Sequence, residues 1–146
     1  MVEFAIVAVV FFMLLLGIMD FGRMLFKWNA AAEATRWGAR LAIVCDKPDD
    51  PDTISVQVRD RMQRILPELT EANIVITYYD PEGTPNNSCN KSTCKGVEVR
   101  LVNFAFTPIS PFMNFGLTTV PAFQTYLTRE SMESVNATRQ NPACFI

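Results

Sequence analysis

The fold of this chain is decided by its first apolar stretch, residues 2–19, which read VEFAIVAVVFFMLLLGIM. No charged side chain occurs from Phe4 to Met19, and the stretch approaches the ~20 apolar residues with which a helix crosses a bilayer. A signal peptide would carry basic residues before such a stretch, whereas here Glu3 comes first and Asp20 follows. We therefore predict a membrane-inserted helix that is retained in the working protein.

The helical pattern continues past this stretch to Val44. Alanine is frequent in the second half, and Glu33 and Arg36 have the i, i+3 spacing of neighbours on a helix. A continuous helix from Val2 to Val44 would be roughly 60 Å long, given the helical rise per residue. Residues 1–44 are therefore expected to form a stalk, about half of which projects beyond the bilayer.

Four cysteines accompany the apolar N-terminus, which is typical of a disulfide framework in an oxidising compartment. Three pairings are possible for four cysteines. We favour Cys89 with Cys94, because they bracket a short polar loop, and Cys45 with Cys144, because that bond would tie the C-terminal tail to the end of the stalk. The alternative is a cytosolic protein with reduced cysteines.

The charges that flank the apolar stretch and the four cysteines predict opposite membrane topologies for residues 45–146. Arg23, Lys27, Arg36 and Arg40 lie on its C-terminal side and would favour keeping that side in the cytosol. The disagreement disappears if a basic leader, cut away from the mature chain, set the topology. We expect such a leader, and a gene that encodes no residues before Met1 would contradict this hypothesis.

Glu3 is the one charge near the start of the apolar helix. A carboxylate carried into hydrocarbon costs on the order of a few kcal/mol unless it is paired. The α-ammonium group of a neighbouring subunit is a candidate partner, and this pair would set the axial register between two helices. The alternative is that Glu3 lies in the polar headgroup layer without a special role.

Residues 45–146 are expected to form a head of the α+β class. Asp52 is a predicted N-cap for a second helix that ends before Pro67. One face of this helix is apolar and should pack on the stalk: Ile54, Val58, Met62, Ile65 and Leu66.

Three segments of the head have the composition of strands: residues 74–79, 97–106 and 117–129. The first precedes a predicted turn at residues 80–83, and the second ends at Thr107-Pro108. They predict a small antiparallel sheet of three or four strands packed on the helices. Residues 130–146 show no period and are expected to form an extended tail held by the cysteine near its end.

Composition and charge exclude several function classes. The net charge of −2 offers no basic field for nucleic acid, and the absence of histidine removes the commonest general base and metal ligand. Asp46, Asp49, Asp50 and Asp52 could bind a cation, but a solvated capping loop explains them better. We therefore expect neither an enzyme nor a cofactor or metal site.

Three N-terminal motifs occur in a characteristic order: VEFAIV at residues 2–7, GIMDFGR at 17–23 and ATRWGARLA at 34–42. A fourth similarity is a strand before Thr107-Pro108 and a last strand that ends near Arg129-Glu130. Together they resemble the TadE-like family of tight-adherence pilus proteins over most of the chain. The resemblance implies a pilin-like fold, removal of a leader by a prepilin peptidase, and extraction from the inner membrane.

Four residues within the N-terminal motifs are expected to take part in assembly: Glu3, Phe4, Asp20 and Arg23. The resemblance also implies an N-terminal acid near the fifth mature position, whereas the acid here is the third residue. The cleavage site therefore differs, or residues upstream are absent.

The sequence predicts a structural pilin-like subunit that assembles through its N-terminal helix into a helical filament of identical subunits on the bacterial surface. Other pilins and the inner-membrane assembly machinery are the expected partners. One alternative is a minor or tip pilin that initiates assembly. Another is a membrane-anchored periplasmic adaptor that binds a partner through the sheet edge and does not polymerise.

Overall fold

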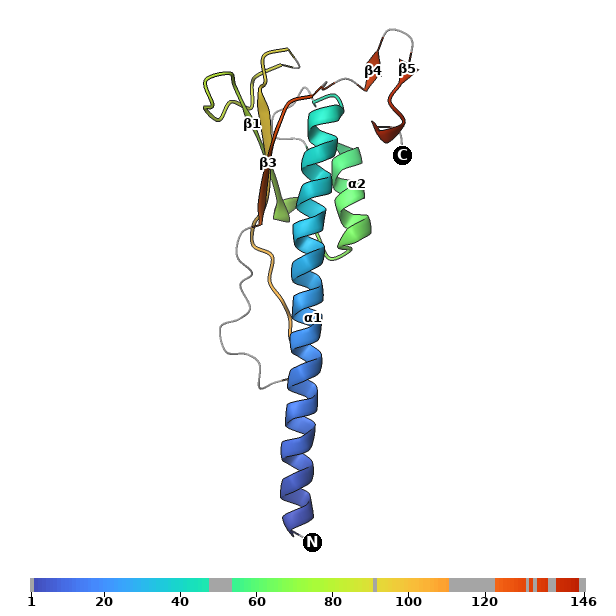
Figure 1. Cartoon of the computed structure of the whole chain (residues 1–146), viewed down its shortest axis with the longest axis vertical. Coiled ribbons are helices and arrows are strands. Elements are labelled where there is room, and N and C mark those ends of the chain that lie inside the picture. Colours follow the sequence, from blue (N-terminus) through green and yellow to red (C-terminus); the bar gives the residue numbers. More distant parts are fainter. Residues whose placement is uncertain are drawn as a thin grey trace.

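The computed structural model describes residues 2–47, 54–90, 92–110, 123–130, 132, 134–136 and 139–144. One long helix carries a small α+β head around its C-terminal half, and its N-terminal half extends away from the head (Figure 1). Among these described residues the helices are α1 (Val2–Val44), α2 (Val56–Ile65) and the short 3-10 helices at Glu71–Asn73 and Pro142–Cys144. The strands are β1 (Ile74–Tyr79), β2 (Gly96–Leu101), β3 (Gln124–Thr128), β4 (Val135–Asn136) and β5 (Arg139–Gln140).

Helix α1 runs without interruption from Val2 to Val44, as predicted. Its C-terminal half is buried mainly through small side chains, which allow α2 and the sheet to approach its backbone closely. The alanines buried in this half are Ala30, Ala31, Ala34, Ala39 and Ala42. The head is therefore built around the second half of the helix and leaves the first half outside its core.

Helix α2 packs beside α1 through the predicted apolar face. Val58, Met62 and Leu66 are buried, and the helix ends at Ile65, before Pro67. The N-cap is Ser55, so the prediction of Asp52 as the cap is corrected; Asp52 itself lies outside the described residues. Helix α2 therefore begins later in the chain than the predicted N-cap at Asp52 indicated.

The three-stranded sheet has the order β1-β2-β3, and both pairs are antiparallel. Strand β1 matches the predicted segment, and β3 falls within the predicted segment 117–129, of which residues 117–122 lie outside the described residues. Strand β2 ends at Leu101 and does not reach residue 106, so the prediction of a longer strand was wrong.

The early end of β2 has a local cause. Asn103 adopts a φ of 52°, which takes the chain out of the extended conformation that a strand requires. The Asn73 side chain holds this bend, because its Nδ2 donates to the carbonyls of Val102 at 3.1 Å and Asn103 at 3.2 Å. Residues 102–110 then leave the sheet and run along α1.

The core surrounds the C-terminal half of α1, which packs against β2 and β3 of the sheet and against α2 (Figure 1). Val97, Val99 and Leu101 of β2 are almost fully buried, and Glu98 and Arg100 point away from them, as the alternation in the sequence predicted. A polar contact crosses the same layer, where the hydroxyls of Thr35 on α1 and Thr125 on β3 lie 3.2 Å apart. The structure is thus the predicted α+β, pilin-like arrangement.

The C-terminal tail has more structure than the extended segment we predicted, because β4 and β5 pair as a small antiparallel hairpin. Disulfides join Cys45 to Cys144 and Cys89 to Cys94, which are the two favoured pairs. The amide of Met132 also donates to the Ile43 carbonyl at 3.0 Å, so this hydrogen bond and the Cys45–Cys144 disulfide both fasten the tail near the end of α1.

The contact between α1 and α2 gives a first prediction about stability. A Cβ added at Gly38 would lie 2.6 Å from the Met62 Sδ, whereas a Cβ at Gly22 would meet nothing within 4 Å. Gly38→Ala is therefore expected to reduce the free energy of unfolding by about 1–2 kcal/mol, because Met62 is fully buried and has little room to move.

Gly22→Ala is the matched control for Gly38→Ala. It should raise the free energy of unfolding by about 0.5–1 kcal/mol, since alanine favours the helix and no neighbour obstructs it. Urea titration of the full chain in detergent, followed by tryptophan fluorescence, measures both variants. Equal effects of the two substitutions would contradict the close packing at Gly38.

Candidate functional site

The uncovered half of α1, residues 2–19, is the candidate functional surface. Phe4 is 79% exposed, Val7 66% and Leu14 64%, and large apolar side chains are accessible on every side of the helix. This half is about 27 Å long, which is close to the thickness of the hydrocarbon core of a bilayer. A helix that is apolar all round belongs in lipid or among other helices, so the chain is membrane-associated.

Glu3 and Phe4 lie at the free end of this surface, far from the head (Figure 1). Both side chains are exposed, and Glu3 has no hydrogen-bond or ion-pair partner among the residues that the structure describes. Phe4 is the most exposed of the large apolar residues on the helix. The end of α1 therefore exposes an acid and an aromatic ring side by side.

Asp20 and Arg23 lie where the uncovered half of α1 meets the head. The two side chains are joined at 3.3 Å, between the Arg23 Nη1 and the Asp20 Oδ1. About 26 Å of helix separates Glu3 from Asp20, given the rise per residue. The structure thus brings two of the four predicted residues together and places the other two at the far end of the surface.

The Asp20 carboxylate binds a distant segment of the same chain. Its two oxygens accept hydrogen bonds from consecutive backbone amides, Ile109 at 3.0 Å and Ser110 at 2.7 Å. Asp20 is only 1% exposed, although it directly follows the uncovered residues 2–19 of the same helix. Asp20 is therefore engaged within its own subunit, a role that the sequence motif did not reveal.

We call residues 102–110 the strap, because they run from the end of β2 down the side of α1 to Asp20 (Figure 1). The buried ring of Phe106 lies under two cations of α1, with its centroid 5.8 Å from the Arg23 Cζ and 5.3 Å from the Lys27 Nζ. Lys27 also forms an ion pair with Glu68 at 2.6 Å. The strap thus extends the head to the edge of the apolar surface.

The strap contacts were not predicted, although the sequence held a signal for them. Asp20 stands between Met19 and Phe21 in an apolar context, and a charge in that context needs a partner. The strap lies about 90 residues away in sequence, so no local pattern identifies Ile109 and Ser110 as the donors. Only the fold of the whole head brings these two amides to the Asp20 carboxylate.

Removing the Asp20 carboxylate should free the end of the strap. In Asp20→Ala, the amides of Ile109 and Ser110 lose their acceptors, and we expect their hydrogen exchange to accelerate by about ten-fold or more. Arg23→Gln is the control, because it leaves both amide bonds in place and should change exchange much less. Unchanged protection of the two amides in Asp20→Ala would contradict this anchoring role.

The described residues contain no group of three or more His, Cys, Asp or Glu side chains that could hold a metal ion. Of the acids considered for a cation, Asp46 is exposed, and Asp49, Asp50 and Asp52 lie outside the described residues. The side chains that the candidate surface exposes are apolar, apart from the Glu3 carboxylate at its free end.

The fold and this surface define a class of protein: a membrane-associated protein of pilin-like fold with an uncovered N-terminal helix. A family model described as TadE-like protein matches residues 1–40, which confirms the resemblance drawn from the N-terminal motifs. The match covers the uncovered half of α1, Asp20, Arg23 and most of the helix that packs in the head. No curated protein and no solved structure matches the chain.

Proposed function

We propose that this chain is a structural pilin-like subunit that assembles into an extracellular filament through the uncovered half of α1. The TadE-like match indicates a pilus-associated protein. The observation that carries the finer proposal is the exposure of residues 2–19 on every side, over a length of about 27 Å. Such a surface suits lipid before assembly and a bundle of helices afterwards.

The driving force for assembly is the burial of this apolar surface. Each Å² removed from water contributes roughly 25 cal/mol, and close packing with neighbouring helices adds dispersion contacts that lipid tails provide less well. In this proposal residues 1–44 form the filament core as a stalk, and the heads of residues 45–146 form its outer layer. The C-terminal half of α1 belongs to both, because the head packs around it.

The four predicted assembly residues then divide into two pairs with different tasks. Glu3 and Phe4 contact a neighbouring subunit, since both are exposed at the free end of the helix. Asp20 and Arg23 act from within the subunit by holding the strap against α1. They would thereby fix the position of the edge of the head that is nearest to residues 2–19. That edge would limit how closely the stalks of two subunits approach each other.

The proposed route follows the resemblance to pilus proteins. A leader would be removed by a prepilin peptidase, the subunit would wait in the inner membrane, and the assembly machinery would extract it into the fibre together with other pilins. Two disulfides in the head support exposure to an oxidising compartment. The final location in this proposal is a pilus on the bacterial surface.

Electron microscopy of material sheared from cells, with mass spectrometry of the main fibre band, tests the proposal. Thin filaments made chiefly of this chain, with a processed N-terminus, are the expected result. Recovery of the chain at low abundance in fibres built from another subunit would favour the minor or tip pilin. Retention in the inner membrane without filaments would favour the adaptor that does not polymerise.

A further inference from the structure

Exposed apolar side chains gather where the uncovered half of α1 meets the head. Beyond residue 19 this cluster consists of Phe21, Leu25, Phe26 and Trp28 on α1 and of Ile109 at the end of the strap. The other large apolar residues that are exposed in the described part of the head are Val56, Tyr126 and Val135, which lie on three different elements. The exposed apolar surface of the head is therefore concentrated at its junction with residues 2–19.

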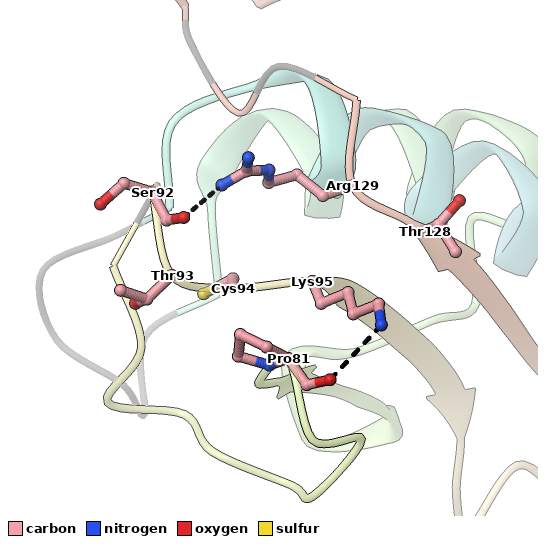
Figure 2. A pocket seen from close by; sticks show the side chains of 7 residues that line it. All are labelled: Pro81, Ser92, Thr93, Cys94, Lys95, Thr128 and Arg129. Atoms are coloured by element: carbon pink, nitrogen blue, oxygen red, sulfur yellow. Dashed lines mark hydrogen bonds between the residues drawn. The ribbon is translucent and has the colours of Figure 1, made fainter.

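The opposite end of the head is polar. Figure 2 shows a surface groove there, whose lining includes Ser92, Thr93, Lys95 and Arg129. The Lys95 Nζ lies 3.4 Å from the Pro81 carbonyl, and the Arg129 Nη1 donates to the Ser92 carbonyl at 2.7 Å. The two ends of the head thus differ in polarity, and the apolar end is the one from which residues 2–19 extend (Figure 1).

The apolar residues at the junction are distributed around α1 and do not form a single face. Phe21 and Leu25 lie about 100° and 140° around the helix from Asp20, given about 3.6 residues per turn. Phe26 lies about 240° around on the same count. Ile109 covers the side of Asp20 itself, because its amide donates to that carboxylate at 3.0 Å. We call Phe21, Leu25, Phe26 and Ile109 the collar.

Charged groups fix the level of the collar relative to a bilayer. The Asp20 carboxylate is held by the strap, and the Lys27 Nζ pairs with the Glu68 carboxylate at 2.6 Å. Moving these charges into hydrocarbon would cost on the order of a few kcal/mol each. Residues 2–19 already supply about 27 Å of apolar helix for the hydrocarbon core. The collar therefore lies directly outside that core.

The height of the collar matches the headgroup layer. The helix rises by about 9 Å from Asp20 to Phe26, and the headgroup layer of one leaflet is roughly 5–8 Å thick. Side chains on a helix tilt toward its N-terminus, so the rings of Phe21 and Phe26 reach toward the bilayer. Both rings are thus placed at the boundary between headgroups and acyl chains.

We propose that the collar binds the surface of the lipid bilayer and seats the head on it before assembly. Lipid surrounds a stalk on all sides, as the collar does, whereas a docked subunit would cover one face. The strap contributes Ile109, so Asp20 also holds that side chain at the level of the headgroups. The inference concerns the single subunit in the membrane and goes beyond the proposed filament.

Depth measurements on the full chain in phosphatidylcholine nanodiscs, with a single chain in each disc, test the inference. A bimane label is attached to Ile109→Cys or to Phe26→Cys, and lipids with a nitroxide on the headgroup quench its fluorescence. The native cysteines are buried in disulfides and do not take the label. We expect quenching at both sites to be at least about two-fold stronger than at the control site, Val56→Cys.

Val56 is the matched control because it is 52% exposed, close to the 63% of Ile109. It lies at the start of α2, which runs in the opposite direction to α1 (Figure 1). Met62, further along α2, packs at Gly38, and Gly38 is already about 27 Å along α1 from Asp20. Headgroup nitroxides should therefore quench a label at Val56 only weakly.

Three results would overturn the inference. Weak quenching at all three sites would mean that the head stands clear of the bilayer. Strong quenching at only one of Ile109 and Phe26 would indicate one lipid-facing side, with the other free to dock a second subunit. Strong quenching at Val56 as well would mean that the head lies flat on the bilayer. None of these results depends on filament formation, which electron microscopy reports separately.

Discussion

Replacing Cys45 and Cys144 together by serine is expected to lower the free energy of unfolding of the head by about 4–5 kcal/mol. This disulfide joins residues 99 apart in sequence, and the entropy cost of closing a loop of that length amounts to about 4.7 kcal/mol in the unfolded chain. Without the bond, the described contacts that still hold the tail include the hydrogen bond of the Met132 amide and the 2.8 Å hydrogen bond from the Asp46 amide to the Ser134 hydroxyl.

The Cys89–Cys94 pair provides the control for this effect. It joins residues only 5 apart, so its removal should lower the free energy of unfolding by about 2 kcal/mol on the same argument. Urea unfolding of the full chain in detergent, followed by the fluorescence of Trp37 beside α2, compares the two double-serine variants. Similar midpoints for both would show that loop length does not govern the stability of the head.

The parts of this fold that the sequence predicted are those set by local pattern. Helix α1 follows from an apolar stretch and an alanine-rich continuation, and its first and last residues were predicted correctly. Strand β1 follows from a run of β-branched and aromatic residues that ends at a turn containing Gly83, whose φ is +81°. In each case the neighbouring residues carry enough information to select one conformation.

The parts that escaped prediction depend on partners far away in sequence. The bend at Asn103 is held by Asn73, and the role of Asp20 appears only when the strap reaches it from about 90 residues away. The 2.7 Å hydrogen bond from the Arg129 amide to the Lys95 carbonyl likewise follows from the register of β2 and β3. A sequence pattern indicates that a residue needs a partner, but only the assembled head determines which partner it has.

The strap also connects the head to the proposed assembly surface. Its end covers Asp20 and leaves Ile109 63% exposed beside the start of the uncovered helix. A neighbour that packed along residues 2–19 on the side of the strap would therefore meet the strap before the rest of the head (Figure 1). On that side, the position at which the Asp20 carboxylate holds the strap would set the length of helix available for stalk packing.

Glu3→Gln is expected to reduce the amount of filament by about ten-fold or more while the subunit still folds and remains in the membrane. The substitution keeps the size of the side chain and removes its charge. In the proposed bundle Glu3 pairs with the α-ammonium of a neighbouring chain, and loss of that pair leaves an uncompensated charge at every subunit contact. A penalty of about 1.4 kcal/mol at each contact already corresponds to ten-fold weaker association.

Glu33→Gln is the matched control for this substitution on the same helix. The Glu33 carboxylate is 49% exposed and lies 3.9 Å from the Arg36 guanidinium, so its loss should cost at most a few tenths of a kcal/mol. Sheared filaments are quantified by electron microscopy and immunoblotting, and the membrane fraction reports the level of unassembled subunit. Normal filaments from Glu3→Gln would mean that apolar contact alone sets the axial register of the stalks. The alternative would then hold, in which Glu3 lies in the polar headgroup layer without a special role.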